Sequence, residues 1–133
     1  MKRVTTHQAQ AEELLSAMNL LMNDVASYKS AVALLAVHSA IAFNDAVLEK
    51  LGVATSKKSP DHSAAYKKTD KACVEKKIDR NGLQHLRNLL ANKTGYSYSG
   101  IVDEKKAQDA ALKAQRFANW AYGTVLKRES RNV

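Results

Sequence analysis

The sequence is poor in the residues that build β-sheets, tight turns and disulfide-linked folds. Its 133 residues include one cysteine, one proline, two phenylalanines and five glycines. The single cysteine, Cys73, excludes an intrachain disulfide and a cysteine-based metal site. Runs of valine, isoleucine, threonine and aromatic residues, which would form strands, are nearly missing. We therefore expect an all-α protein.

The sequence also has neither the pattern of a secretory signal nor that of a membrane span. Glu12 and Glu13 follow the basic start of the chain, where a signal peptide needs an apolar stretch. The longest apolar tract, residues 31–43, is interrupted by His38 and Ser39 and is shorter than the ~20 residues of a transmembrane helix. These features predict a cytoplasmic protein that does not enter a membrane.

Positive charge dominates the chain and is unevenly distributed. The formal net charge is +8, and residues 57–80 hold eight lysines and arginines against four aspartates and glutamates. Such a field attracts polyanions, so the expected partners are RNA, DNA, nucleotides or an acidic protein. The alternative is a solvated, lysine-rich surface without a specific ligand.

Helical periodicity divides the chain into four main helices and a short one, within a single domain over residues 1–133. Short connections between the helices favour antiparallel neighbours, so we expect an up-and-down four-helix bundle with an additional short helix. The predicted helices cover residues 6–27, 29–51, 59–76, 80–93 and 103–127.

Capping residues set several of these limits. Gly52 is well placed to end the second helix, and Ser59-Pro60 has the pattern of a capping residue followed by proline at the first helical position. Asp79 can cap the fourth helix. The second helix is apolar almost all round, which predicts a position at the centre of the bundle or in a subunit interface.

Three polar residues of the second helix, His38, Asp45 and Glu49, fall within about 40° of one another on its surface. His38 and Asp45 are ~10 Å apart along the axis, which is too far for one shared metal ion. Asp45 and Glu49 could share an ion only if another helix supplied further ligands. We therefore expect no metal and no other cofactor. We interpret the three as buried polar groups with partners, for example a basic side chain beside Asp45.

The fourth helix and the turn after it carry the residues best suited to bind an anion. Arg80 and Arg87 are seven residues apart and share one side of the predicted helix. Guanidinium groups make paired contacts with phosphate, and tyrosine rings can stack on bases. Alternatively, Arg87 pairs with a buried carboxylate and the tyrosines pack against the end of the bundle. The polar and aromatic residues that follow the arginines are Asn88, Asn92, Lys93, Thr94, Tyr96 and Tyr98.

Several stretches together resemble the HEPN superfamily, over about residues 8–125. They are the apolar helix AVALLAVHSAIAFNDAVLEKLG, the basic connection after it, the stretch HLRNLLANKTGYSYSG and the alanine-rich last helix. The resemblance implies an HEPN-like helical bundle that acts as a dimer. Many members of the superfamily are metal-independent ribonucleases, often toxins. Others have lost the catalytic signature and serve as binding modules, some beside a nucleotidyltransferase.

The HEPN signature is an arginine, usually followed by a polar residue, and then a histidine after four to six intervening positions. A tyrosine often follows. Arg87-Asn88 matches the start of this signature and Tyr96 the trailing tyrosine, but Lys93 stands where the histidine is expected. A protonated lysine is a poor general base, although it can hold a phosphate. The resemblance therefore implies a binding protein more readily than a ribonuclease.

A second match to the signature lies upstream, where four residues separate Arg80 from His85. Five helical positions turn the two side chains about 140° apart. They could converge only if Gly82 breaks the helix or if the two groups come from different subunits.

Together these patterns predict an HEPN-like homodimeric module that binds RNA or a nucleotide without cleaving it, with its ligand contacts from Arg80, Arg87, Asn88, Lys93, Tyr96 and Tyr98. One alternative is a metal-independent ribonuclease of the toxin type, with catalytic candidates Arg80, His85 and Arg87, or with His38 as the base. The second alternative is an interaction module that docks an acidic partner such as an antitoxin or a nucleotidyltransferase.

Overall fold

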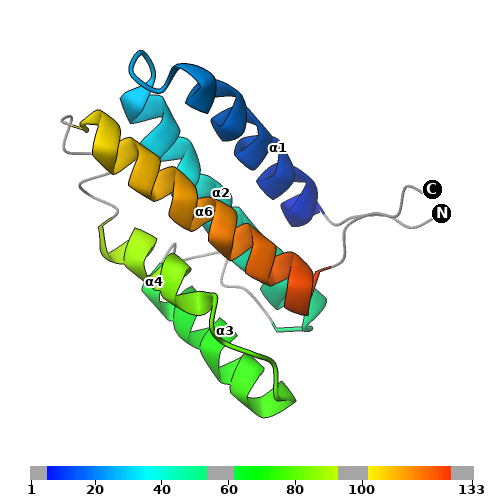
Figure 1. Cartoon of the computed structure of the whole chain (residues 1–133). Coiled ribbons are helices and arrows are strands. Elements are labelled where there is room, and N and C mark those ends of the chain that lie inside the picture. The colour runs from blue at the N-terminus through cyan, green and yellow to red at the C-terminus, as the bar shows by residue number, and fades with distance from the viewer. Residues whose placement is uncertain (1–5, 54–61, 93–101, 127–133) are drawn as a thin grey trace.

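Helices account for all the regular secondary structure in the part of the chain that the structure describes. The structure is a computed structural model, and it describes residues 6–53, 62–92 and 102–126 (Figure 1). The predicted all-α class is confirmed over these ranges. Their elements are α1 (Thr6–Leu21), the 3-10 helix η1 (Met22–Asp24), α2 (Lys29–Lys50), α3 (His62–Lys76), α4 (Leu83–Ala91) and α6 (Glu104–Thr124).

The long helix α2 connects the two halves of the fold. It packs against α1 and α6, and also against α3 and α4, while α4 lies between α3 and α6. Figure 1 shows α1, α2 and α6 running alongside one another, with the pair α3 and α4 on the opposite side from α1. The predicted central position of the apolar second helix is therefore confirmed.

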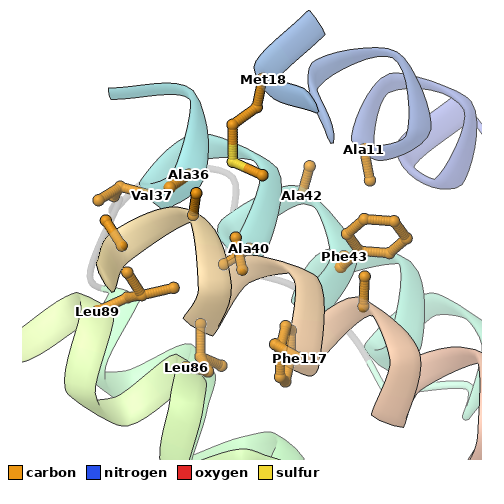
Figure 2. Packing of buried hydrophobic residues seen from close by; sticks show 14 of the residues in the cluster. Ala11, Met18, Ala36, Val37, Ala40, Ala42, Phe43, Leu86, Leu89 and Phe117 are labelled. Atoms are coloured by element: carbon orange, nitrogen blue, oxygen red, sulfur yellow. The ribbon is translucent and has the colours of Figure 1, made fainter. Parts of the chain in front are cut away.

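The core combines alanines on α2 and α6 with larger apolar side chains from several helices (Figure 2). Alanines on α6 allow α2 to approach closely, while Phe43 packs edge-on against Tyr122 and Phe117 stacks with Trp120. Met18 of α1 and Leu86 of α4 close the core from either side. These side chains are fully buried, so each contributes about 1.5–3 kcal/mol to folding through the hydrophobic effect. The buried alanines of α6 are Ala107, Ala110, Ala111, Ala114, Ala118 and Ala121.

By length and composition, α2 is the one described helix that could cross a membrane. Within the fold, 67% of its most apolar stretch is buried against the other helices. The core helix of a globular fold has the same property, so its apolar composition is explained by packing inside the chain.

The capping glycine predicted for the second helix is confirmed. Gly52 has a φ of 76°, its N–H donates to the Glu49 carbonyl at 3.1 Å, and the Val53 N–H donates to the Leu48 carbonyl at 2.9 Å. This pattern satisfies carbonyls that the last turn of a helix leaves without partners. At the start of α6, the Asp103 side chain accepts from the Lys106 N–H at 2.7 Å and caps the helix.

The start predicted for the fourth helix is wrong, because α4 begins at Leu83 and not at Arg80. Asp79 does not cap it. Its carboxylate accepts from the Asn81 N–H at 3.2 Å, and its carbonyl accepts from the Trp120 indole at 2.8 Å. These bonds hold residues 79–82 as a turn against α6, so Arg80 stands before the helix. The predicted Ser59-Pro60 start of the third helix lies outside the described residues, whereas its end at Lys76 is confirmed.

Candidate anion-binding surface

The turn before α4 and the flank of α3 together form a surface hollow of about 490 Å³, here called the α3–α4 hollow. Two of the arginines predicted to bind phosphate contribute to it, although only one of them belongs to α4. Apolar packing of Leu83 and Leu86 beneath it fixes α4 in place. The hollow is lined by Tyr66, Asp70, Ile78, Asp79, Arg80, Asn81, Gln84 and Arg87.

Arg80 forms the one ion pair in the lining of this hollow among the described residues. Its Nη1 lies 3.1 Å from Oδ1 of Asp70, and the two side chains are 53% and 37% exposed. An ion pair with this exposure contributes at most about 1 kcal/mol, because water screens it. An incoming anion can therefore displace Asp70 from Arg80 at small cost.

Arg87 is exposed, and its guanidinium makes no hydrogen bond or ion pair with another described residue. The alternative in which Arg87 pairs with Asp45 or Glu49 is not realised among these residues. The same side chain lines a second, smaller hollow of about 230 Å³ together with Tyr66, Leu90 and Ala91. Arg87 and Tyr66 therefore stand where the two hollows meet.

Sequence reasoning missed Tyr66 and Asp70, because no anion-binding motif includes them. The available signal was their spacing, since residues four apart on α3 lie on one face of the helix. Beneath this face, the buried Cys73 thiol has a raised pKa, caused first by burial and then by the Asp70 charge, which the charge of Arg80 partly offsets. Cys73 is thus held in its neutral, unreactive form.

The turn that presents Arg80 is held by Trp120 of α6. The indole donates to the Asp79 carbonyl, stacks with Phe117 at a centroid distance of 5.4 Å and is only 7% exposed. Gly82 packs directly against it, and a Cβ built on Gly82 would overlap the Cβ and Cγ atoms of Trp120. The position of Arg80 therefore depends on a residue forty positions away in the sequence.

The other flank of α4 faces α6. A separate group of basic side chains lies there, formed by His85 of α4 with Lys113 and Arg116 of α6. Lys113 donates to the Asn88 side-chain oxygen at 2.6 Å and to Asp109 at 2.7 Å. His85 is half-buried, and its pKa is lowered first by burial and then by the charges of Arg116 and Lys113. Its imidazole is therefore neutral at pH 7.

Arg80 and His85, which match the HEPN signature by spacing, have different neighbours. Arg80 contacts Asp70 of α3, whereas the charges that act on His85 come from α6. Convergence of the two side chains within one chain requires a break at Gly82, and α4 does begin only after this residue. Even so, Arg80 lies on the α3 side of α4 and His85 on the α6 side. Nothing in this placement supports joint action of Arg80 and His85 on one phosphate within a chain.

The interpretation of His38, Asp45 and Glu49 as buried polar groups is wrong for two of them. His38 and Glu49 are exposed, and Asp45 is half-buried. His38 and Glu49 therefore face outward from α2. A buried polar contact between helices that the sequence pattern did not reveal joins α2 to α3, where Thr69 donates to the Asn44 side chain at 2.6 Å.

The remaining predicted residues divide between described and undescribed parts of the chain. Asn88 is exposed and accepts from Lys113, so it lies beside the basic group facing α6. Lys93, Tyr96 and Tyr98 lie outside the described residues. Within the described ranges, no three histidine, cysteine, aspartate or glutamate side chains are grouped so that they could hold a metal ion.

Comparison of the chain with protein-family models, with curated proteins and with solved structures found no match. The HEPN resemblance thus stays a prediction.

Proposed function

We propose that this chain is an HEPN-like helical module that binds RNA or a nucleotide, with the α3–α4 hollow as its phosphate site. The observation that carries the proposal is that Arg80 and Arg87 line one hollow, while Arg87 makes no ion pair with a described acidic residue. Paired N–H donors of guanidinium groups match the oxygens of a phosphate. The net charge of +8 supports an anionic ligand.

Binding requires a rearrangement at only one residue of the hollow. A phosphate between the arginines competes with Asp70 for the Arg80 guanidinium, and the exposed Asp70 carboxylate then returns to water. Tyr66, at the junction of the two hollows, offers a ring for stacking against a base. Asn81 and Gln84 add amide groups that can bond to base or sugar.

The proposal does not include cleavage of the ligand. Acid–base chemistry on a phosphate needs a titrating group within hydrogen-bond reach of the reacting oxygen. The described residues of the hollow include no histidine, because His85 lies on the α6 side of α4. Arg80 and Arg87 therefore serve as binding groups and not as members of a catalytic pair.

Two substitutions with opposite expected effects test the phosphate site. Arg87→Ala removes a charge-assisted contact worth about 1.5–3 kcal/mol and should weaken binding of a fluorescein-labelled single-stranded RNA about tenfold or more. Asp70→Asn keeps the shape of the side chain, removes the competing charge and should strengthen binding about twofold to threefold. Fluorescence anisotropy without added metal ions measures both.

The matched control is Lys29→Ala, which removes an exposed positive charge at the start of α2, outside the hollow. It should leave affinity nearly unchanged, and all three variants should melt like the parent chain because the substituted side chains lie at the surface. Equal affinity of the parent, Arg87→Ala and Asp70→Asn proteins would rule out the α3–α4 hollow as the phosphate site.

A further inference from the structure

The α6 flank of α4 has a defined geometry that the phosphate site does not use. Lys113 and Trp120 of α6 both contact the α4 region, through Asn88 and the Asp79 carbonyl. Arg116 lies between them at helical spacing, so it projects toward the same flank. Arg116 is exposed, and neither it nor His85 makes a hydrogen bond or ion pair with another described residue.

We infer that His85 and Arg116 form a second phosphate contact on this flank, so that the ligand is a single-stranded nucleic-acid chain rather than a mononucleotide. This inference rests on the proposed phosphate site in the α3–α4 hollow. Together the two contacts place cations on both sides of one helix.

The width of α4 separates the two contacts by more than one phosphate can span. An α-helix with its side chains is ~10–12 Å across, whereas charge-assisted hydrogen bonds to a phosphate are ~2.7–2.9 Å long. A phosphate held by Arg80 and Arg87 therefore cannot also reach Arg116. A second phosphate, further along the same chain, is needed to use both flanks.

The exposed face of α4 between the two contacts suits a chain of negative charges. Gln84, Arg87, Asn88 and Ala91 are spaced as one stripe, and all four are exposed. The helix has no acidic residue. A polyanion that crosses α4 thus contacts amide groups and a cation, and no acidic residue of this helix repels it.

His85 makes the second contact dependent on pH. The positive charges facing it are Arg116 and Lys113 of α6, and Lys113 is paired with Asp109. Burial lowers the pKa of His85 most, and the charges of Arg116 and Lys113 lower it further. A bound phosphate offsets these positive charges and favours the imidazolium, so binding takes up a proton. His85 therefore has a higher pKa in the complex than in the free protein. As the pH falls, affinity should rise from the pKa in the complex down to the pKa in the free protein, and stay constant below that.

The experiment measures binding of an RNA of about twelve nucleotides that carries a rhodamine label, whose emission does not depend on pH in this range; the length is within the ~4–16 that single-strand binding domains cover. Phosphodiesters do not titrate between about pH 5.5 and 8, so a change in affinity over this range reports on the protein. We expect affinity to increase severalfold toward pH 5.5, and His85→Gln to remove this dependence. Arg116→Gln should weaken binding about tenfold at pH 6.

Each outcome decides between the two proposals. Arg116→Gln is an exposed substitution that should fold normally, so the result does not depend on how the half-buried His85 tolerates replacement. If Arg87→Ala weakens binding while Arg116→Gln and His85→Gln leave affinity and pH dependence unchanged, the second contact is refuted and the first stands. The second contact would also be refuted if adenosine monophosphate displaced the labelled RNA at a concentration similar to that of unlabelled RNA. If the parent chain does not bind the RNA, both proposals are refuted.

Discussion

At the scale of single residues, the contact between Gly82 and Trp120 fixes the turn that carries Arg80. The Trp120 indole fills the space that any side chain at position 82 would need. Because the ring is buried, stacked on Phe117 and bonded to the Asp79 carbonyl, it cannot move aside without breaking other contacts. The turn of residues 79–82 is therefore anchored to the core, which favours the proposed phosphate contact because the backbone of Arg80 has little freedom to lose.

We predict that Gly82→Ala destabilises the fold by about 1–3 kcal/mol, because the added methyl group overpacks the contact with Trp120. Urea unfolding followed by circular dichroism measures the loss. The matched control is Gly123→Ala in α6, where an added Cβ meets nothing within 4 Å. That change should be neutral or stabilising by up to ~1 kcal/mol, through helix propensity. Equal stability of the two variants would contradict the close packing of α4 on α6.

At the scale of elements, the end of α3 contains a residue in an unfavourable backbone conformation. Lys77 has a φ of 58°, in the left-handed region, and the Ile78 N–H donates to the Cys73 carbonyl at 2.8 Å across it. Gly52 occupies the equivalent position after α2, where glycine adopts this conformation without a Cβ clash. Both helices thus end at a residue in the left-handed conformation. This residue is an unstrained glycine after α2 and a strained lysine after α3.

Replacing Lys77 by glycine should stabilise the protein by about 0.5–1 kcal/mol. The left-handed conformation costs an L-residue roughly 1–2 kcal/mol, and the greater freedom of glycine in the unfolded chain takes back part of this gain. Thermal melts should show a higher Tm for Lys77→Gly, while Gly52→Ala should show a lower one for the same reason. A lower Tm for Lys77→Gly would mean that the lysine side chain makes a stabilising contact.

The helices could be predicted from sequence where periodicity and a glycine cap coincide, as they do in α2. The start of α4 could not, because Asp79 has the pattern of a capping residue and only its bond with distant Trp120 commits it to a turn. For the same reason, the sequence placed Arg80 and Arg87 together but missed Tyr66, which joins them only through the packing of α3 on α4. The outward position of His38 was also hidden, because an apolar helix gives no sign of which side its neighbours leave open.

At the scale of the whole molecule, the apolar character of α2 has an explanation within one chain. The helix is in contact with α1, α3, α4 and α6, and residues such as Phe43 and Val47 are fully buried by them. The apolar pattern of this helix predicts either a central position or a subunit interface, and the HEPN resemblance implies a dimer. Since the neighbours cover most of it, the homodimer stays a prediction that needs support from elsewhere, for instance from a site shared between subunits.

The charges that flank α4 should give RNA binding a marked dependence on salt. Each phosphate neutralised on a single strand contributes about −0.7 to the slope of log K against log salt concentration, because bound counterions are released. Two phosphates, one held by Arg80 and Arg87 and the other by Arg116 with His85, predict a slope of about −1.4. Arg87→Ala and Arg116→Gln should each reduce its magnitude by about 0.7, whereas Lys29→Ala should leave it unchanged. Anisotropy titrations at several salt concentrations give these slopes. A slope near zero in the parent chain would mean that the ligand is held by stacking or apolar contacts, and that the cations around α4 only keep the surface hydrated.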